Sequence, residues 1–253
     1  MHDVLQDLSD GKITIAEAEA KLLGYATSEA GRFDTAREHR HGVPEGILCD
    51  GKTMEEIITF ASIAIETIGR AIVTRTTPEI QKAIQEHFPQ SIKVKSHPLS
   101  RTIIAKTSEF ESPTLNATVA IVTAGTSDRP IAEEAAIIAS EMGANIVQIN
   151  DVGVAGLHRL LDQIELIRSA DVAIVAAGRE GTLPSLVAGL VDTPVIGLPV
   201  STGYGFGGSG EAALTSMLQS CAVLTTVNID AGFIAGAQAG MIARSISAAR
   251  GKK

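Results

Sequence analysis

Two side chains in the second half of the chain have the chemistry of a nucleophile and of a proton carrier. Cys221 stands near the end of a predicted helix, and an ionised thiol is a strong nucleophile. The negative end of a helix dipole opposes that ionisation, and a lone cysteine is most often a small buried hydrophobe, so packing is the alternative. Glu180 stands between two glycines after a predicted strand, where a carboxylate can transfer a proton. Its alternative is an exposed loop carboxylate, and Cys49, in an apolar strand, is expected to pack in a core.

Four glycine-rich segments follow predicted strands and would bring the backbone close to a ligand. They span residues 124–128, 150–159, 177–184 and 200–210. Small residues let main-chain amides at helix N-termini approach a phosphate or carboxylate, and Asp151 could bind a ribose hydroxyl. Ordinary helix capping and flexible surface loops are the alternative interpretations. The first segment is neither a Walker loop nor a Gly-x-Gly-x-x-Gly fingerprint.

Composition argues against several classes of protein. The formal net charge is −8 and no basic tract stands out, which disfavours a nucleic-acid partner. Two cysteines do not make a disulfide framework, and we find no apolar signal core and no membrane-spanning run, so the expected location is the cytoplasm. The six histidines lack metal-ligand spacing and no Ser-His-Asp arrangement is evident, so metal ligands are left unassigned.

The elements that must position these loops follow a βα alternation in the second half. Continuous apolar runs, typical of strands covered on both faces, alternate with helical segments, which predicts a parallel sheet. In such sheets ligands bind beyond the carboxyl ends of the strands, where all four glycine-rich segments are expected. The predicted strands are residues 118–123, 145–149, 171–176, 194–198 and 223–227, and an Ala-rich helix over 231–249 follows them.

The first half is expected to be a smaller α+β domain. Residues 108–116 are polar, contain Pro113 and lack apolar periodicity, which favours a boundary there and gives domains of residues 1–112 and 113–253. Capping signals predict one helix over 53–68 and another that begins at Thr77 and Pro78. The predicted strands are residues 46–49, 71–74, 92–94 and 102–105, after a short helical region and a charged stretch over 32–41.

Several of these segments resemble a known group of enzymes, the PurE-type carboxyaminoimidazole ribonucleotide mutases. Residues 125–128 are similar to the Gly-Ser-x-Ser-Asp loop of that family, and residues 177–184 and 194–197 are similar to its later segments. The mutases carry a His immediately before the Leu-Pro pair, where this chain has Thr182. Their Ser-Ala-His-Arg loop is replaced here by residues 151–159, and both departures argue against mutase activity.

The chain as a whole resembles the LarB family, which carries a PurE-like C-terminal domain. The similar segments are Asp-Val-Gly-Val-Ala-Gly-x-His-Arg, Gly-x-Glu-Gly-x-Leu-Pro-Ser, Ser-x-Gly-Tyr-Gly, and Ser-Cys followed by Asn-Ile-Asp. The LarB-like positions of the first half are Asp34, Arg37, Arg40, Gly42, Pro44, Glu45, residues 51–53 and residues 71–75. The resemblance implies a PurE-like or flavodoxin-like three-layer domain that follows a smaller α+β domain. Cys49 and Ala231 depart from the family pattern, which has Gly and Asn there.

The resemblance implies a substrate and a reaction. LarB enzymes carboxylate the pyridinium ring of nicotinic acid adenine dinucleotide with CO2 and hydrolyse its phosphoanhydride. The products are AMP and pyridinium-3,5-biscarboxylic acid mononucleotide, the precursor of the nickel-pincer cofactor of lactate racemase. Cys221 is then the nucleophile and Glu180 the proton carrier. The residues assigned to substrate binding are Gly125, Thr126, Ser127, Asp128, Asp151, Gly178, Arg179, Gly181, Ser201, Gly203 and Tyr204, with Asp34, Arg37 and Arg40 from the first domain.

The resemblance to LarB also implies cofactors and an oligomeric state, and it leaves two alternative functions open. No tightly bound cofactor is expected, Mg2+ is a candidate, and CO2 is a co-substrate. A homo-oligomer is expected, an octamer by analogy with PurE, and the Ala- and Gly-rich helix over 231–249 offers a packing surface for subunit contacts. Two alternatives stay open at this point: a PurE-like aminoimidazole ribonucleotide carboxylase or mutase, and a non-catalytic nucleotide-binding module. For Asp34, Arg37 and Arg40 the local alternative is a solvated charge cluster.

Overall fold

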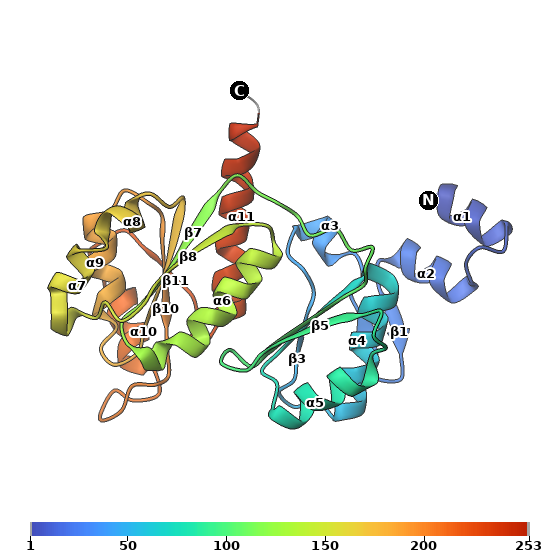
Figure 1. Cartoon of the computed structure of the whole chain (residues 1–253), viewed down its shortest axis with the longest axis horizontal. Helices are drawn as coiled ribbons and strands as arrows, with labels where there is room; N and C mark the ends of the chain where they lie inside the picture. Colours follow the sequence, from blue (N-terminus) through green and yellow to red (C-terminus); the bar gives the residue numbers. More distant parts are fainter. Residues whose placement is uncertain (1, 252–253) are drawn as a thin grey trace. The chain divides into compact units, whose positions relative to one another are not determined.

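The computed structural model describes residues 2–251, which form two compact units, Met1–Glu111 and Ser112–Lys253 (Figure 1). Each unit has a sheet of its own, and each is described by itself below. Among the described residues, no helix is both long enough and apolar enough to cross a membrane.

The second unit is built on a five-stranded, fully parallel sheet with the order β11-β10-β9-β7-β8. Strands β7 and β9 lie in the middle and are almost entirely buried, which explains their continuous apolar sequences. The chain runs from β7 outward to β8 and then returns to the other side of β7 to form β9. The strands are β7 (Thr118–Thr123), β8 (Asn145–Ile149), β9 (Val172–Ala177), β10 (Val195–Pro199) and β11 (Thr225–Thr226).

Helices cover both faces of this sheet and make a three-layer α/β domain, as the sequence predicts. One face packs against α6 (Arg129–Glu141) and α11 (Gly232–Arg250), and their alanines form one apolar cluster with β7 and β9. The other face packs against residues of the remaining helices, which form a second apolar cluster with the sheet. Those helices are α7 (Leu157–Leu161), α8 (Ile164–Arg168), α9 (Thr182–Leu190) and α10 (Glu211–Leu218). The short 3-10 turn η1 (Thr126–Asp128) leads into α6, and η2 (Val154–Gly156) leads into α7.

Glycines on α11 allow it to approach α6 closely. A Cβ on Gly236 would lie 2.4 Å from the carbonyl oxygen of Ala135, and a Cβ on Gly232 would lie 2.6 Å from that of Ile131. The small residues of α11 are therefore buried inside the unit. The prediction that this Ala- and Gly-rich surface serves subunit contacts is wrong for its small-residue face, because α6 already occupies it.

The first unit contains a four-stranded mixed sheet with the order β3-β4-β6-β5. β3 runs parallel to β4, whereas β6 is antiparallel to both β4 and β5, so the unit is α+β as predicted. α4 and α5 supply the apolar cluster that packs on one face of the sheet. These elements are β3 (Gly46–Leu48), α4 (Met54–Ile68), β4 (Arg70–Thr74), α5 (Pro78–His87), β5 (Lys93–His97) and β6 (Thr102–Lys106).

Before this sheet, the first unit has elements that the sequence analysis did not resolve. They are α1 (His2–Ser9), the hairpin of β1 (Ala26–Ser28) and β2 (Gly31–Phe33), and α3 (Arg37–His41). The short helical region expected there is present as α2 (Ile15–Leu23). The charged stretch is ordered by ion pairs: Arg40 binds both oxygens of Asp34 at 3.1 and 2.6 Å. These side chains are paired and remain partly exposed, so a solvated charge cluster stays an alternative to a binding role.

Candidate functional site

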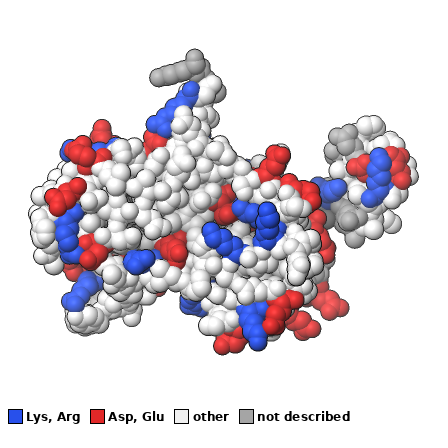
Figure 2. Space-filling model, in the orientation of Figure 1, with Lys and Arg blue, Asp and Glu red and all other residues white. Residues whose placement is uncertain are grey.

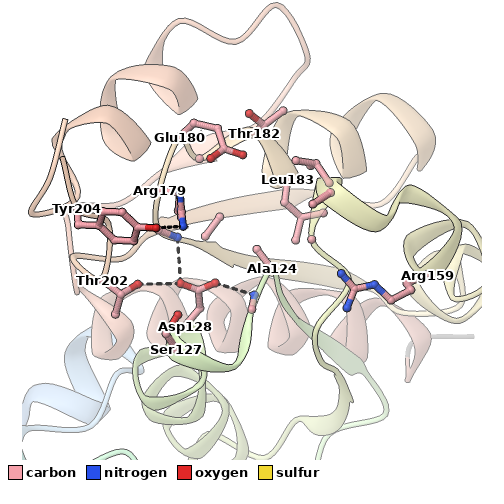
Figure 3. A pocket seen from close by; sticks show the side chains of 17 residues that line it. Ala124, Ser127, Asp128, Arg159, Arg179, Glu180, Thr182, Leu183, Thr202 and Tyr204 are labelled. Carbon is pink, nitrogen blue, oxygen red and sulfur yellow. Dashed lines mark hydrogen bonds between the residues drawn. The ribbon is translucent and has the colours of Figure 1, made fainter. Parts of the chain in front are cut away.

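A cavity of about 540 Å3 lies at the carboxyl ends of the parallel strands, where β7 and β9 are neighbours (Figure 3). This is the point at which the order of the strands reverses, the usual ligand position in open α/β sheets. The lining comes from the loops after β7, β8, β9 and β10. It comprises Ala124, Gly125, Ser127, Asp128, Gly153, Val154, Ala155, Arg159, Ala177, Gly178, Arg179, Glu180, Gly181, Thr182, Leu183, Thr202 and Tyr204.

Asp128 is the buried carboxylate that joins three of these loops. Its Oδ2 accepts a hydrogen bond from the amide of Gly125 at 2.8 Å. Its Oδ1 accepts bonds from the amide of Gly178 at 3.0 Å and from Oγ1 of Thr202 at 3.1 Å (Figure 3). Both oxygens are thus engaged by the protein. The substrate-binding role that sequence reasoning assigned to Asp128 stays a prediction, and these hydrogen bonds show that Asp128 also holds the loops of the cavity together.

Burial raises the pKa of the Asp128 carboxyl above its ordinary value of 3.8. The hydrogen bonds from Gly125, Thr202 and Gly178 favour the charged form and oppose this shift without reversing it. The nearby charge of Glu180 adds to the increase, because two carboxylates resist ionising together.

The loops after β9 and β10 touch through their backbones, which requires glycine on both sides. A Cβ on Gly178 would lie 2.6 Å from Oγ1 of Thr202, and a Cβ on Gly203 would lie 3.0 Å from the amide nitrogen of Arg179. Gly181 has a φ of +64° and would place a Cβ 2.6 Å from Ala213. These contacts explain the glycines that sequence reasoning assigned to binding: Gly178, Gly181 and Gly203 permit close packing of the loops.

The charged side chains of the lining are Asp128, Arg159, Arg179 and Glu180. Glu180 is exposed and lines the cavity, and its role as a proton carrier stays a prediction. The guanidinium of Arg179 stacks on the ring of Tyr204, with 4.2 Å from Cζ to the ring centroid, and its Nη2 donates to the phenolic oxygen. The lining of the cavity therefore presents both carboxylates and cations.

Arg159 is a residue that the sequence analysis quoted in a motif but did not assign to the site. Its Nη1 lies 2.6 Å from Oδ2 of Asp151, and it lines both the main cavity and a neighbouring hollow of about 360 Å3. Asp151 lines the neighbouring hollow and has a φ of +61°. Sequence spacing alone could not place Arg159, because its position depends on the path of η2 before α7.

Cys221 is exposed between α10 and β11 and is not one of the seventeen lining residues. Its assignment as the nucleophile stays a prediction. Thr126 and Ser201 also lie outside the lining, and the amide of Ser201 donates to Asp230 at 2.9 Å. Cys49 is buried, and that burial raises the pKa of its thiol to about 11, which agrees with the expected packing role.

The three candidates of the first unit are held in ion pairs. Asp34 pairs with Arg40, and a hydrogen bond from Arg40 is the main cause that lowers the pKa of Asp34. Arg37 binds Glu45 at 2.8 Å, although burial still raises the pKa of Glu45. A role in substrate binding stays a prediction for Asp34, Arg37 and Arg40.

A metal site is not preformed in the part of the chain that the structure describes. Among the side chains that the structure describes, no group of three or more His, Cys, Asp or Glu is arranged to hold a metal ion. The expected Mg2+ therefore has no ready-made set of protein ligands among them.

Residues 118–253, just over half of the chain, match the family model of AIR carboxylase, which points to a carboxylase-type α/β enzyme. Residues 25–107 match the model described as the LarB/PurE-like N-terminal domain. The chain belongs to the LarB family, as the resemblance of its motifs indicates.

Two relatives from Methanocaldococcus jannaschii are similar to this chain, one over nearly its whole length and one over less than half of it. The uncharacterized protein MJ0165 is 38% identical over 253 residues, which is 96% of this chain and 97% of the relative. An N5-carboxyaminoimidazole ribonucleotide mutase is 36% identical over 119 residues, 45% of this chain and 71% of the mutase. A crystal structure of Treponema denticola PurE, 17% identical, covers 53% of this chain and 94% of its own with a TM-score of 0.37.

Proposed function

We propose that this protein carboxylates the pyridinium ring of nicotinic acid adenine dinucleotide and hydrolyses its phosphoanhydride. The observation that carries the proposal is the cavity itself, which combines Glu180 with the cations Arg159 and Arg179 at the reversal point of a carboxylase-type sheet. The substrate carries a cationic ring, a ring carboxylate and two phosphates, and this set of charges complements the lining. Its products would be AMP and pyridinium-3,5-biscarboxylic acid mononucleotide, for synthesis of the nickel-pincer cofactor.

The reaction needs the ring to become a nucleophile before it meets CO2. A pyridinium ring is electron-poor, so its C5 cannot attack CO2 directly. Addition of the Cys221 thiolate at C4 gives an enamine-like dihydropyridine, and C5 then forms the new carbon–carbon bond. Glu180 accepts the proton from C5, the ring electrons return, and the thiolate leaves C4. The net change is one CO2 gained and one proton lost, without an oxidant or reductant.

Hydrolysis of the phosphoanhydride follows by attack of water, and the cavity supplies charge for it. Arg159 borders both hollows and is fixed by Asp151, so it is a suitable partner for the phosphates. Mg2+ stays a candidate that would enter with the phosphates, since no preformed metal site exists among residues 2–251.

The exposed position of Cys221 sets a condition on this mechanism. Within one chain the thiol lies outside the lining of the cavity that holds Glu180. We therefore propose that the Cys221 thiol that attacks a pyridinium ring belongs to a neighbouring copy of the chain in a homo-oligomer. The expected homo-octamer would provide such neighbours.

Product analysis tests the proposed function. Incubation of the protein with nicotinic acid adenine dinucleotide and bicarbonate-equilibrated CO2 is expected to yield AMP and a mononucleotide heavier by one CO2, which mass spectrometry resolves. Labelled bicarbonate should shift the product mass by the label. Unchanged dinucleotide across a range of Mg2+ and CO2 concentrations would refute the proposal.

Two other functions make different predictions in the same assay. A PurE-like enzyme would instead convert an aminoimidazole ribonucleotide, but this chain has Thr182 at the position of the mutase His. A nucleotide-binding module would bind the dinucleotide and leave it intact. No observation on the cavity favours either over the proposed carboxylation.

A further inference from the structure

Arg179 and Tyr204 form a cation–π contact at the edge of the cavity. A planar, delocalised cation covers the ring face at 4.2 Å, close to the optimum for a cation–π contact. Tyr204 is 73% exposed, so the phenol is held at the surface of the site and not in a core. Figure 3 shows both side chains on the same side of the cavity as Glu180.

The backbone holds the Tyr204 loop in this place independently of the Arg179 side chain. Gly203 packs on the backbone of Arg179, and Thr202 is fixed by its hydrogen bond to Asp128. Arg179 itself has a φ of +37°, a conformation that L residues adopt rarely and that a surrounding structure must impose. The ring should therefore remain beside the cavity when the guanidinium moves away.

We infer that Tyr204 is the platform for the pyridinium ring and that Arg179 occupies this platform in the free protein. The inference rests on the proposed function and names the residues that select the substrate. A pyridinium ring is, like guanidinium, a planar cation with spread charge, and two cations cannot share one ring face. The incoming ring displaces Arg179, whose fork of donors then binds the carboxylate on ring C3.

This exchange gives the site two kinds of selectivity. Tyr204 favours a charged pyridinium over a neutral dihydropyridine, because the attraction comes from the positive charge over the ring face. Arg179 favours nicotinic acid over nicotinamide, because only the acid offers a charged, bidentate acceptor. Glu180 is the next residue after Arg179, so the same step would bring the substrate ring towards the proposed base.

Binding measurements in CO2-depleted buffer test the inference. The ligands are nicotinic acid adenine dinucleotide, NAD and NADH, titrated by calorimetry, with chromatography to confirm that each stays intact. Tyr204→Leu should weaken binding of the two pyridinium ligands by about 10-fold and that of NADH by less than about 2-fold. Tyr204→Phe keeps the ring and should stay close to wild type. Arg179→Gln should reduce the preference for the acid over NAD by about 10-fold.

Tyr25 provides the matched control. It also carries an arginine on its ring, with Arg32 Cζ at 5.1 Å, but it belongs to the first unit and does not line the cavity. Tyr25→Leu should leave all three affinities unchanged. The chain has two tyrosines and no tryptophan, so Tyr25→Phe leaves Tyr204 as the emitter, and a bound pyridinium should quench its fluorescence more than NADH at equal occupancy.

The outcomes separate the inference from the proposed function. If Tyr204→Leu weakens all three ligands equally, or none of them, Tyr204 is not a cation platform, and the carboxylase proposal stands. If Arg179→Gln keeps the acid preference, the carboxylate contact is wrong. A wild-type protein that binds none of the three dinucleotides would overturn the proposed function, and the inference with it.

Discussion

The two cysteines of the chain should respond to substitution in opposite ways. Cys221→Ser changes an exposed side chain, so folding should be unaffected, but a hydroxyl cannot supply a nucleophilic anion near neutral pH and carboxylation should fall by at least about 100-fold. Cys49→Ala should keep the activity and lose about 1 kcal/mol of stability, because it removes a buried sulfur. Mass spectrometry of the product and thermal unfolding check both variants. Full activity in Cys221→Ser would remove covalent catalysis.

Asp128 gives a prediction on pH because its pKa is raised in the folded protein. A group with a raised pKa contributes stability that is complete below its unfolded value, here 3.8, and is lost as pH rises through the folded value. Asp128→Asn does not titrate, and its amide cannot accept the Gly125 hydrogen bond and that of Thr202 together. The excess stability of the wild type over this variant should therefore shrink from pH 4 to pH 7.

Urea unfolding of both proteins at pH 4, 5.5 and 7 measures that difference directly. A difference that grows with pH would mean that the hydrogen bonds to Asp128 outweigh its burial.

At the level of single residues, the sequence identified the loops but not the roles inside them. Glu180, Arg179 and Tyr204 line the cavity, as expected of residues that follow the strands of a parallel sheet. Asp128 could not be recognised as the common acceptor of three loops, because its partners Gly178 and Thr202 are far away in the sequence.

At the level of elements, substitutions at glycines can test how much the stability of the second unit depends on the close contact between α6 and α11. Gly236→Ala places a Cβ 2.4 Å from a backbone oxygen, so it should destabilise the second unit by about 1–3 kcal/mol. Gly189→Ala, at an exposed position of α9 with open space around it, should instead stabilise by about 0.5–1 kcal/mol through helix propensity. Differential scanning calorimetry of the two variants and the wild type should show a lower melting temperature for Gly236→Ala and a higher one for Gly189→Ala. Equal effects would mean that α11 can shift away from α6.

The sequence predicted the strands of the parallel sheet well because strands buried on both faces leave unbroken apolar runs. The exception is the last strand, expected over residues 223–227 and observed as Thr225–Thr226, which pairs with two residues of β10. Short elements such as β1, β2 and α3 carry too few residues for a periodic pattern and were missed.

At the level of the whole molecule, the exposed surface favours association. Helix α7 presents Leu157 and Leu161, one turn apart, at 44% and 48% exposure, and Leu218 and Val223 flank Cys221 at 67% and 92%. Exposed apolar side chains such as these can be buried in a contact between subunits. We therefore expect a homo-oligomer, and light scattering at working concentration should give a mass well above 26.3 kDa. A monomer mass would contradict this.

Mixed assemblies test whether the proposed active site is shared between copies. Cys221→Ser and Glu180→Gln should each be inactive alone. When the two are unfolded together and refolded, some sites receive an intact thiol from one copy and an intact carboxylate from another, so part of the activity should return. Refolded samples of each single variant are the controls. No recovery in a mixed oligomer would mean that the Cys221 thiol and the Glu180 carboxylate act within one chain. Movement of the 200–210 loop would then be needed to bring them together.

Figure 2 shows Lys and Arg side chains interspersed with Asp and Glu on the visible face, without a broad region of one sign. Together with the net charge of −8, this distribution gives no general attraction for an anionic dinucleotide. Capture of the substrate should then depend on the arginines of the cavity, and its affinity should fall only moderately as the salt concentration rises.

The single carboxylate that joins three loops also constrains how related sequences can diverge. Loss of the Thr202 hydroxyl removes one of the two donors to Oδ1 of Asp128, and a Cβ at residue 178 would lie 2.6 Å from that hydroxyl oxygen. A change at 128 frees the amides of two loops at once. Neutral drift at these positions is therefore coupled, and a substitution in one loop should persist only with a matching substitution in another. Loops exchanged singly between relatives should give poorly active hybrids, whereas the three exchanged as a set should not.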